Sequence, residues 1–181
     1  MKYEPYAPRD AEALVSFLTG ETWPFHSQPV LRSKAVRDRH DRGDYDGEDV
    51  RTFWMVLGSE RVGLIVLDDL NDPTAMFDLR IAAAHRGQGH GTAAVAWLTT
   101  YLFTSRRDVG RVEAVTRQDN AAMRAAMRRC GYAKESHYRE AWPGSAGTVH
   151  DSVGYAITRT DWDSGTVTYP DWNDDPADAP S

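Results

Sequence analysis

The chain has 181 residues and a formal net charge of −6 at pH 7, which suits one domain and argues against a protein that mainly binds nucleic-acid backbone. Its hydrophobic content of 41% and six tryptophans are enough for a packed core, and the single cysteine, Cys130, excludes a disulfide within the chain. We see no signal-peptide pattern and no run of eighteen apolar residues, so we expect a cytoplasmic protein that does not bind membranes.

The first part of the chain predicts a short strand, two helices and a hairpin. We expect the strand over residues 2–6, and a helix that begins at Pro8 or Asp10 and ends at Gly20. A second, more polar helix is expected over residues 31–42. The apolar runs 52–57 and 62–67 flank a short polar turn, which is the pattern of a β-hairpin.

The second part predicts strands that alternate with two helices. The expected elements are a strand at 75–81, a helix at 89–104, a strand at 111–116, a helix at 120–129, and strands at 133–141 and 149–158. Only the two helices are expected to connect parallel neighbours. The sequence thus predicts an α+β (mixed α/β) fold with a mixed, mostly antiparallel sheet and about four helices. We expect one domain over residues 1–162 and an acidic Pro/Asp-rich tail over 163–181.

The most informative stretch is 86–92, with the sequence RGQGHGT, between a predicted strand and an amphipathic helix. Glycines at every second position let the backbone approach a ligand closely and point successive N–H groups in one direction. The first turn of the helix adds unpaired amides and the positive end of the helix dipole. The stretch therefore predicts a cradle for a diphosphate.

Three phosphate-binding patterns compete for this stretch. Gly89, Gly91 and Ala94 match the dinucleotide-binding pattern GxGxxG/A weakly, but no β-α-β unit precedes them. A Walker A loop needs a lysine, and the stretch has none. The third pattern, RxxGxG, is met by Arg86, Gly89 and Gly91.

On this third pattern, the run from Phe77 to Gly91 resembles the acetyl-CoA motif of the GNAT acetyltransferases. Residues 111–120 and 128–132 resemble the strand, Asn, helix and Gly-aromatic order of the same superfamily. Residues 151–162 are similar to the end of its RimJ/RimL-type members. The resemblance covers roughly 75–162 by motif and 1–74 by element order.

The resemblance implies an acetyl-CoA site with named residues. Backbone amides of the cradle would bind the pyrophosphate, and Arg86 would lie beside it. These amides are those of Gln88, Gly89, His90, Gly91 and Thr92. The backbone of Ile81 and Ala83 would pair with the pantetheine amides, and the Asn120 side chain would bond the same arm. Arg124 and Arg128 would meet CoA phosphates, or would instead lie on a solvated helix face.

The acceptor chemistry needs a base, because an amine attacks a thioester only when it is neutral. We rank Glu113 and Asp78 first, since both lie on predicted central strands near the point where the sheet should open. Ion pairs with arginines such as Arg80 or Arg111 are the alternative for these carboxylates. His26 is the third candidate.

The leaving thiolate is often protonated in this superfamily by a tyrosine seven residues after the asparagine. That position holds Met127 here, and the third position after the asparagine holds Met123. We therefore consider Tyr138 or Tyr132 as a replacement acid, or a thiolate that leaves without one.

The segment around His26 is expected to line the acceptor pocket, with Trp23 and Phe25 as apolar walls or as plain core aromatics. The remaining histidines have no metal-ligand spacing, so we predict no metal site.

The leading hypothesis is N-acetylation of a primary amine by acetyl-CoA, either on a protein N-terminus or on a small molecule. A non-catalytic acyl-CoA-binding or sensor domain is the second hypothesis, which the missing tyrosine keeps open. A nucleotide-binding oxidoreductase is the third. The resemblance also implies a homodimer.

Overall fold

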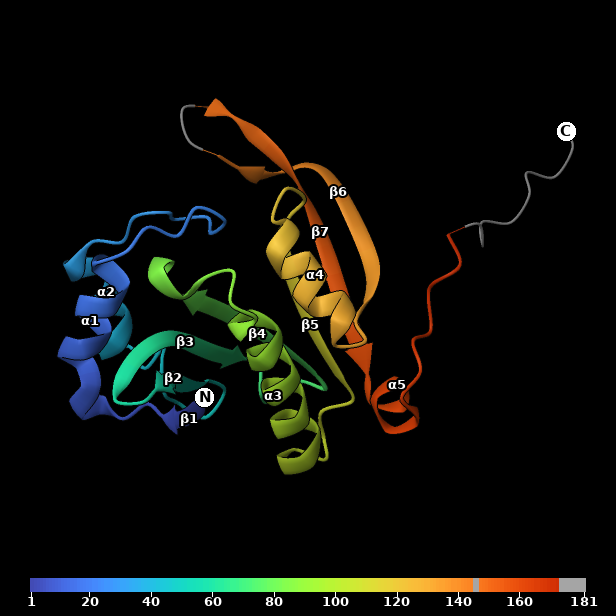
Figure 1. Ribbon diagram of the computed structural model, residues 1–181, viewed down its shortest axis with the longest axis horizontal. Coiled ribbons are helices and arrows are strands. Elements are labelled where there is room, and N and C mark those ends of the chain that lie inside the picture. The colour runs from blue at the N-terminus through green and yellow to red at the C-terminus, as the bar shows by residue number, and fades with distance from the viewer. Residues whose placement is uncertain (145–146, 173–181) are drawn as a thin grey trace, which may run out of the picture.

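The computed structural model describes residues 1–144 and 147–172, and within them one seven-stranded sheet forms the centre of the fold (Figure 1). The strand order is β1-β2-β3-β4-β5-β7-β6, and β4 and β5 are the parallel pair. The strands are β1 (Lys2–Pro5), β2 (Arg51–Leu57), β3 (Glu60–Asp68), β4 (Thr74–Ile81), β5 (Arg111–Arg117), β6 (Ala133–Pro143) and β7 (Val149–Thr158).

Helices cover both faces of the sheet. They are α1 (Ala11–Thr19), α2 (Ser33–Asp41), α3 (His90–Ser105), α4 (Ala121–Arg129) and the short α5 (Arg159–Ser164). Along β2, Phe53 and Met55 point to the core under α3 and α4, while Trp54 and Val56 point to a second core under α1 and α2. Because both faces of β2 and β3 are buried, these strands are continuous apolar runs rather than alternating ones.

The predicted fold class is confirmed, and the predicted elements occur in the predicted order. One connection was predicted wrongly. The helix at 120–129 was expected to join parallel neighbours, but β7 lies between β5 and β6. The reason is that β7 pairs antiparallel with the whole length of β5, from Arg111↔Thr158 to Arg117↔Ser152, and thereby separates β5 from β6.

The sheet opens between its two parallel strands. β4 pairs with β5 only at Thr74–Met76, opposite Arg111–Glu113, and beyond that point the strands diverge. The amide of Ala82 donates to Val62 on β3. Since successive peptide groups of a strand point to opposite edges, those of Leu79 and Ile81 point away from β3 into the opening.

The predicted boundary at Trp162 falls inside α5. Beyond it, the Thr168 hydroxyl donates to the buried Asp161 carboxylate at 2.7 Å, so the chain remains attached to the domain at least to this point. Residues 173–181 of the predicted tail lie outside the described residues. No helix in the described part of the chain is long and apolar enough to span a membrane.

Candidate active site

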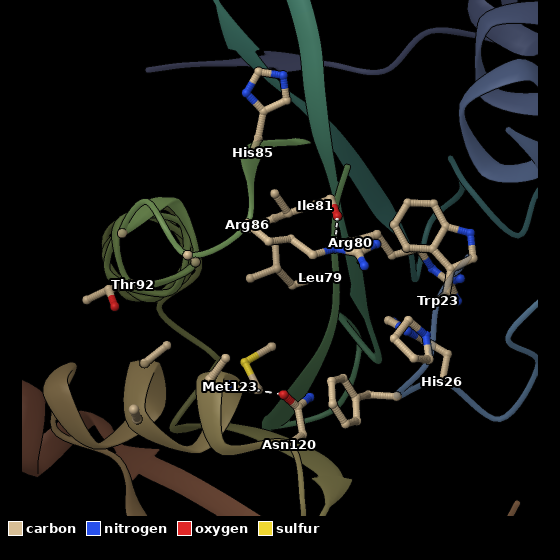
Figure 2. A pocket seen from close by; sticks show the side chains of 18 of the residues that line it. Trp23, His26, Leu79, Arg80, Ile81, His85, Arg86, Thr92, Asn120 and Met123 are labelled. Carbon is tan, nitrogen blue, oxygen red and sulfur yellow. Dashed lines mark hydrogen bonds between the residues drawn. The ribbon is translucent and has the colours of Figure 1, made fainter. Parts of the chain in front are cut away.

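A pocket of about 290 Å³ lies at the opening between β4 and β5. Figure 2 shows α3 with Thr92 on one side, Trp23 and His26 on the opposite side, and the β4 side chains Leu79 and Ile81 between them. Asn120 and Met123 close the end formed by α4. Three segments far apart in the sequence therefore meet here: the loop between α1 and α2 (residues 20–32, the α1–α2 loop), β4 with the start of α3, and one face of α4.

The predicted glycine cradle forms one wall of this pocket. Gly87 and Gly89 have φ values of 73° and 83°, a left-handed conformation that side chains disfavour, and Gly89 is the N-cap of α3. A Cβ on Gly91 would meet only the Ile81 side chain, at 3.7 Å, so this position is open toward the pocket. The first amides of α3 have no carbonyl partner within the helix and are suited to an anion.

Arg86 lines the pocket but holds the α1–α2 loop rather than pointing freely at the cradle. Its Nε donates to the Ile81 carbonyl at 2.7 Å, and its Nη2 donates to the Thr22 carbonyl at 2.9 Å. The guanidinium also lies 5.6 Å from the ring centroid of Trp23. Its expected place beside a pyrophosphate stays a prediction.

The two backbone positions expected at the end of β4 lie in different elements, and the pairing expected of both with pantetheine stays a prediction. Ala83 is not in the strand, because β4 ends at Ile81 and a short 3₁₀ helix begins at Ala83. The Ala83 amide donates to the Glu21 carboxylate at 3.3 Å. Leu79 and Ile81 are therefore the residues whose peptide groups face the opening, and Leu79 was not among the predicted site residues.

At α4, Asn120 lines the pocket and also caps the helix. Its Oδ1 accepts from the Met123 amide at 3.2 Å, and its Nδ2 donates to the Thr116 hydroxyl at 3.0 Å. Arg124 instead donates to the Gln118 carbonyl at 2.7 Å and does not line the pocket.

The cation that α4 does place at the pocket is Arg129, at the end of the helix. The family resemblance indicates Arg124 and Arg128 instead. Positions 122, 125, 126 and 129 share the pocket face, which is a helical spacing that would have indicated Arg129.

The α1–α2 loop brings all three predicted acceptor residues to the pocket. Trp23 is 1% exposed, and its Nε1 donates to the Leu18 carbonyl at 2.9 Å, so it is also a core residue. The loop reaches across to β5, where Arg117 donates to the Pro24 carbonyl at 2.9 Å and lies 5.3 Å from the Phe25 ring centroid. No motif in the sequence marked Arg117 for this role.

His26 and Asp78 form a close pair. The distance from His26 Nε2 to Asp78 Oδ1 is 2.7 Å, and the second carboxylate oxygen accepts from Arg80 Nε at 2.9 Å. Burial opposes ionisation of Asp78, but the His26 hydrogen bond and the Arg80 charge outweigh it and lower the pKa of this carboxyl. Asp78 is therefore ionised at neutral pH.

Glu113 lies elsewhere. It borders an acidic groove with Asp69 and Asp72, at the end where β4 and β5 still pair, and its carboxylate accepts from Arg111 Nη2 at 3.1 Å. Of the two carboxylates ranked first as bases, the structure brings Asp78 into contact with a pocket residue and leaves Glu113 outside the pocket.

No tyrosine lines the pocket in the part of the chain that the structure describes. Tyr132 is buried in the core and shares a 2.6 Å hydrogen bond with Thr99, and burial raises its pKa further above the ordinary value. Tyr138 is 57% exposed on β6. Met127, at the position of the family tyrosine, is fully buried, whereas Met123 lines the pocket.

Comparisons with known proteins agree with this architecture. A family described as "Acetyltransferase (GNAT) domain" matches residues 2–133. A spermidine N-acetyltransferase SpeG chimera from Vibrio cholerae and hSSAT superposes with a TM-score of 0.75 at 18% identity, covering 91% of this chain and 99% of that one.

Two further solved structures are similar. Mycobacterium smegmatis RimJ, in complex with CoA-disulfide, has a TM-score of 0.69 at 22% identity and coverages of 88% and 82%. RimL, a ribosomal-protein alpha-N-acetyltransferase in complex with coenzyme A, has a TM-score of 0.69 at 21% identity and coverages of 86% and 92%. The search of curated protein sequences found no match.

Proposed function

The chain belongs to the GNAT acetyltransferase family, and from this premise we propose that it transfers the acetyl group of acetyl-CoA to a primary amine by direct attack on the thioester. The observation that carries the proposal is the opening of the sheet beside the start of α3. There the glycine cradle, the free edge of β4 and Asn120 line one continuous pocket.

The residues present fit a CoA thioester. The amides of the cradle and the positive end of α3 suit a diphosphate. The peptide groups of Leu79 and the amide of Ile81 suit an amide-bearing arm that lies along β4, whereas the Ile81 carbonyl is taken by Arg86. Arg129 supplies a positive charge at the same pocket. Met123 and the alanines of α4 give the wall an apolar surface for the methylene groups of such an arm.

The acceptor is proposed as an amine of one of two classes. SpeG is named for spermidine and RimL for a protein N-terminus, so a polyamine and a peptide α-amine are the two probes to compare. The homodimer implied by the resemblance stays a prediction, which sedimentation of the purified chain would check.

The test is an acetylation assay with acetyl-CoA and each probe, followed by mass spectrometry of the amine and by release of the CoA thiol. We expect one mono-acetylated product and an equal amount of free thiol. Binding of acetyl-CoA without acetylation of any amine would instead favour the non-catalytic acyl-CoA-binding domain. Gly91→Trp serves as the control, because a large side chain at this open position fills the cradle.

A further inference from the structure

The pair formed by His26 and Asp78 joins two sides of the pocket across 52 positions of the sequence. His26 comes from the α1–α2 loop and Asp78 from β4, and their side chains are 24% and 34% exposed. Arg80, which is 9% exposed and lies under the ring of Trp23, fixes the second oxygen of Asp78. The imidazole is therefore held in one orientation by a carboxylate that is itself held by a buried guanidinium.

The second ring nitrogen of His26 is unusual. Nδ1 is buried and has no hydrogen-bond partner within residues 1–144 and 147–172. Because Nε2 faces the carboxylate and donates to it, Nδ1 carries the free lone pair of a neutral imidazole. Buried polar atoms almost always have a partner, so a group that arrives in the pocket is a reasonable partner for this one.

We propose that His26 is the general base of acetyl transfer and that Asp78 is its positioning residue, an inference that rests on the proposed function. A primary ammonium group gives one proton to Nδ1 of His26, and the imidazolium that forms is stabilised by the Asp78 carboxylate. The neutral amine nitrogen then forms its bond to the acetyl carbonyl carbon, and the carbon–sulfur bond breaks.

The protons balance without any other reactant. The nitrogen carries one surplus proton after the attack, and this proton leaves with the departing thiolate, giving the CoA thiol and the amide. His26 returns its own proton to water when the product has left. Nδ1 is buried, and catalytic hydrogen bonds often form only in the substrate complex.

The alternatives for the base are weaker on chemical grounds. Asp78 has a lowered pKa and two ionic partners, so it binds a proton poorly at neutral pH. Glu113 is paired with Arg111 and borders a different groove.

Several other charged or titratable groups surround the pair. Asp68 on β3 borders the small cavity behind Asp78, and burial raises its pKa to about 6. The remaining neighbours on the strands, on α2 and on the loops next to the pair are Arg80, Arg86, Arg117, Arg39 and Tyr45. Asp78 is the neighbour that hydrogen-bonds directly to the imidazole, so its removal is the most informative change.

The first experiment compares His26→Gln with a matched control. Glutamine can still donate to Asp78 but cannot take up the proton, so we expect kcat/KM for the probe amine to fall about 100-fold at pH 7. Acetyl-CoA affinity should change less than about twofold, and the rate loss should shrink near pH 10, where a primary amine becomes neutral unaided.

The control is His137→Gln. His137 forms the same type of pair with Asp151, also at 2.7 Å, but on β6 and β7 outside the pocket, so its rate should not change. A His26→Gln enzyme with wild-type rate and an unchanged pH profile would overturn the base assignment and leave the proposed function intact. A wild-type chain that acetylates neither probe would refute both.

The second experiment tests Asp78 by the split between kcat and substrate affinity. In Asp78→Asn, the His26 ring loses the charged partner that fixes its orientation and stabilises the imidazolium, so we expect kcat to fall about tenfold while acetyl-CoA affinity stays within about twofold. Asp78→Glu keeps a carboxylate and should recover part of the rate. An Asp78→Asn enzyme with a wild-type kcat would overturn the positioning role.

Discussion

One side of the pocket is formed mainly by main-chain groups, and the other is formed mainly by side chains. The side assigned to acetyl-CoA consists mainly of backbone: glycines 87, 89 and 91, the first turn of α3 and the free edge of β4. The side assigned to the amine consists of side chains from the α1–α2 loop, held by Arg86 and Arg117 and by the His26–Asp78 pair. A backbone site tolerates many side-chain changes but few changes of shape, whereas a side-chain site depends on individual groups.

The largest expected effect is the loss of acetyl-CoA affinity when a large side chain fills the glycine cradle. Gly91→Trp should weaken acetyl-CoA binding about 100-fold, which corresponds to roughly 2.7 kcal/mol. Gly91→Ala is the matched control, because its Cβ would make only an ordinary 3.7 Å contact with Ile81. Calorimetric titration measures both. Equal affinity of Gly91→Trp and wild type would remove the cradle from the donor site.

The variant Arg86→Ala tests whether this arginine acts on the acetyl-CoA side or on the amine side of the pocket. Its guanidinium contacts the Thr22 carbonyl and the Trp23 ring, so we expect the acceptor KM to rise about tenfold, or roughly 1.4 kcal/mol, with a smaller change in acetyl-CoA affinity. Steady-state kinetics with each substrate varied in turn separate the effect on the acceptor from the effect on acetyl-CoA. A tenfold loss confined to acetyl-CoA affinity would place Arg86 at the pyrophosphate, as the resemblance implies, and would contradict its assignment to the acceptor side of the pocket.

Asn120 caps α4 in the fold and is also expected to bond the pantetheine arm of acetyl-CoA. Two variants separate these roles. Aspartate is as good an N-cap as asparagine but lacks the amide donor, so Asn120→Asp should keep the melting temperature and weaken acetyl-CoA binding about fivefold. Asn120→Ala should also lose about 1 kcal/mol of stability with the cap. If Asn120→Asp binds acetyl-CoA like the wild type, Asn120 is a capping residue alone.

The smallest expected effect is on the stability of the folded chain, and it comes from Asp68 on β3. Burial raises the pKa of Asp68 to about 6, so the folded state holds this proton more tightly than the unfolded chain. The associated stability is present at low pH and is lost as the pH rises through about 6. Asp68→Asn should therefore raise the melting temperature more at pH 8 than at pH 4.5. An equal shift at both pH values would contradict the raised pKa.

The contrast between the two sides also explains what the sequence could predict. Glycine spacing and helix onset are local features, so the cradle at 86–92 and the order of the elements could be derived from the chain itself. The partnership of His26 with Asp78 depends on the tertiary fold, because the two residues come from different elements. Asp78 was recognised as a candidate base, but its role relative to His26 could not be.

The strand pairing and the position of Glu113 also differ from the sequence-based predictions, because both depend on the tertiary fold. The ladder that β7 forms with β5 is a long-range pairing, and no local pattern distinguishes it from a β6–β5 pairing. Glu113 and Asp78 both lie on central strands and look alike in sequence. They differ because Glu113 sits where β4 and β5 are still paired and Asp78 lies beyond the point at which they diverge.

The most direct test of the central claim is calorimetric titration of the whole chain with acetyl-CoA, with CoA and NAD as comparators. The architecture of the β4–β5 opening predicts saturable micromolar binding of acetyl-CoA and CoA at one site per chain, and much weaker binding of NAD. Binding of NAD in preference to both CoA species would contradict the account and return the glycine stretch to a dinucleotide-binding role.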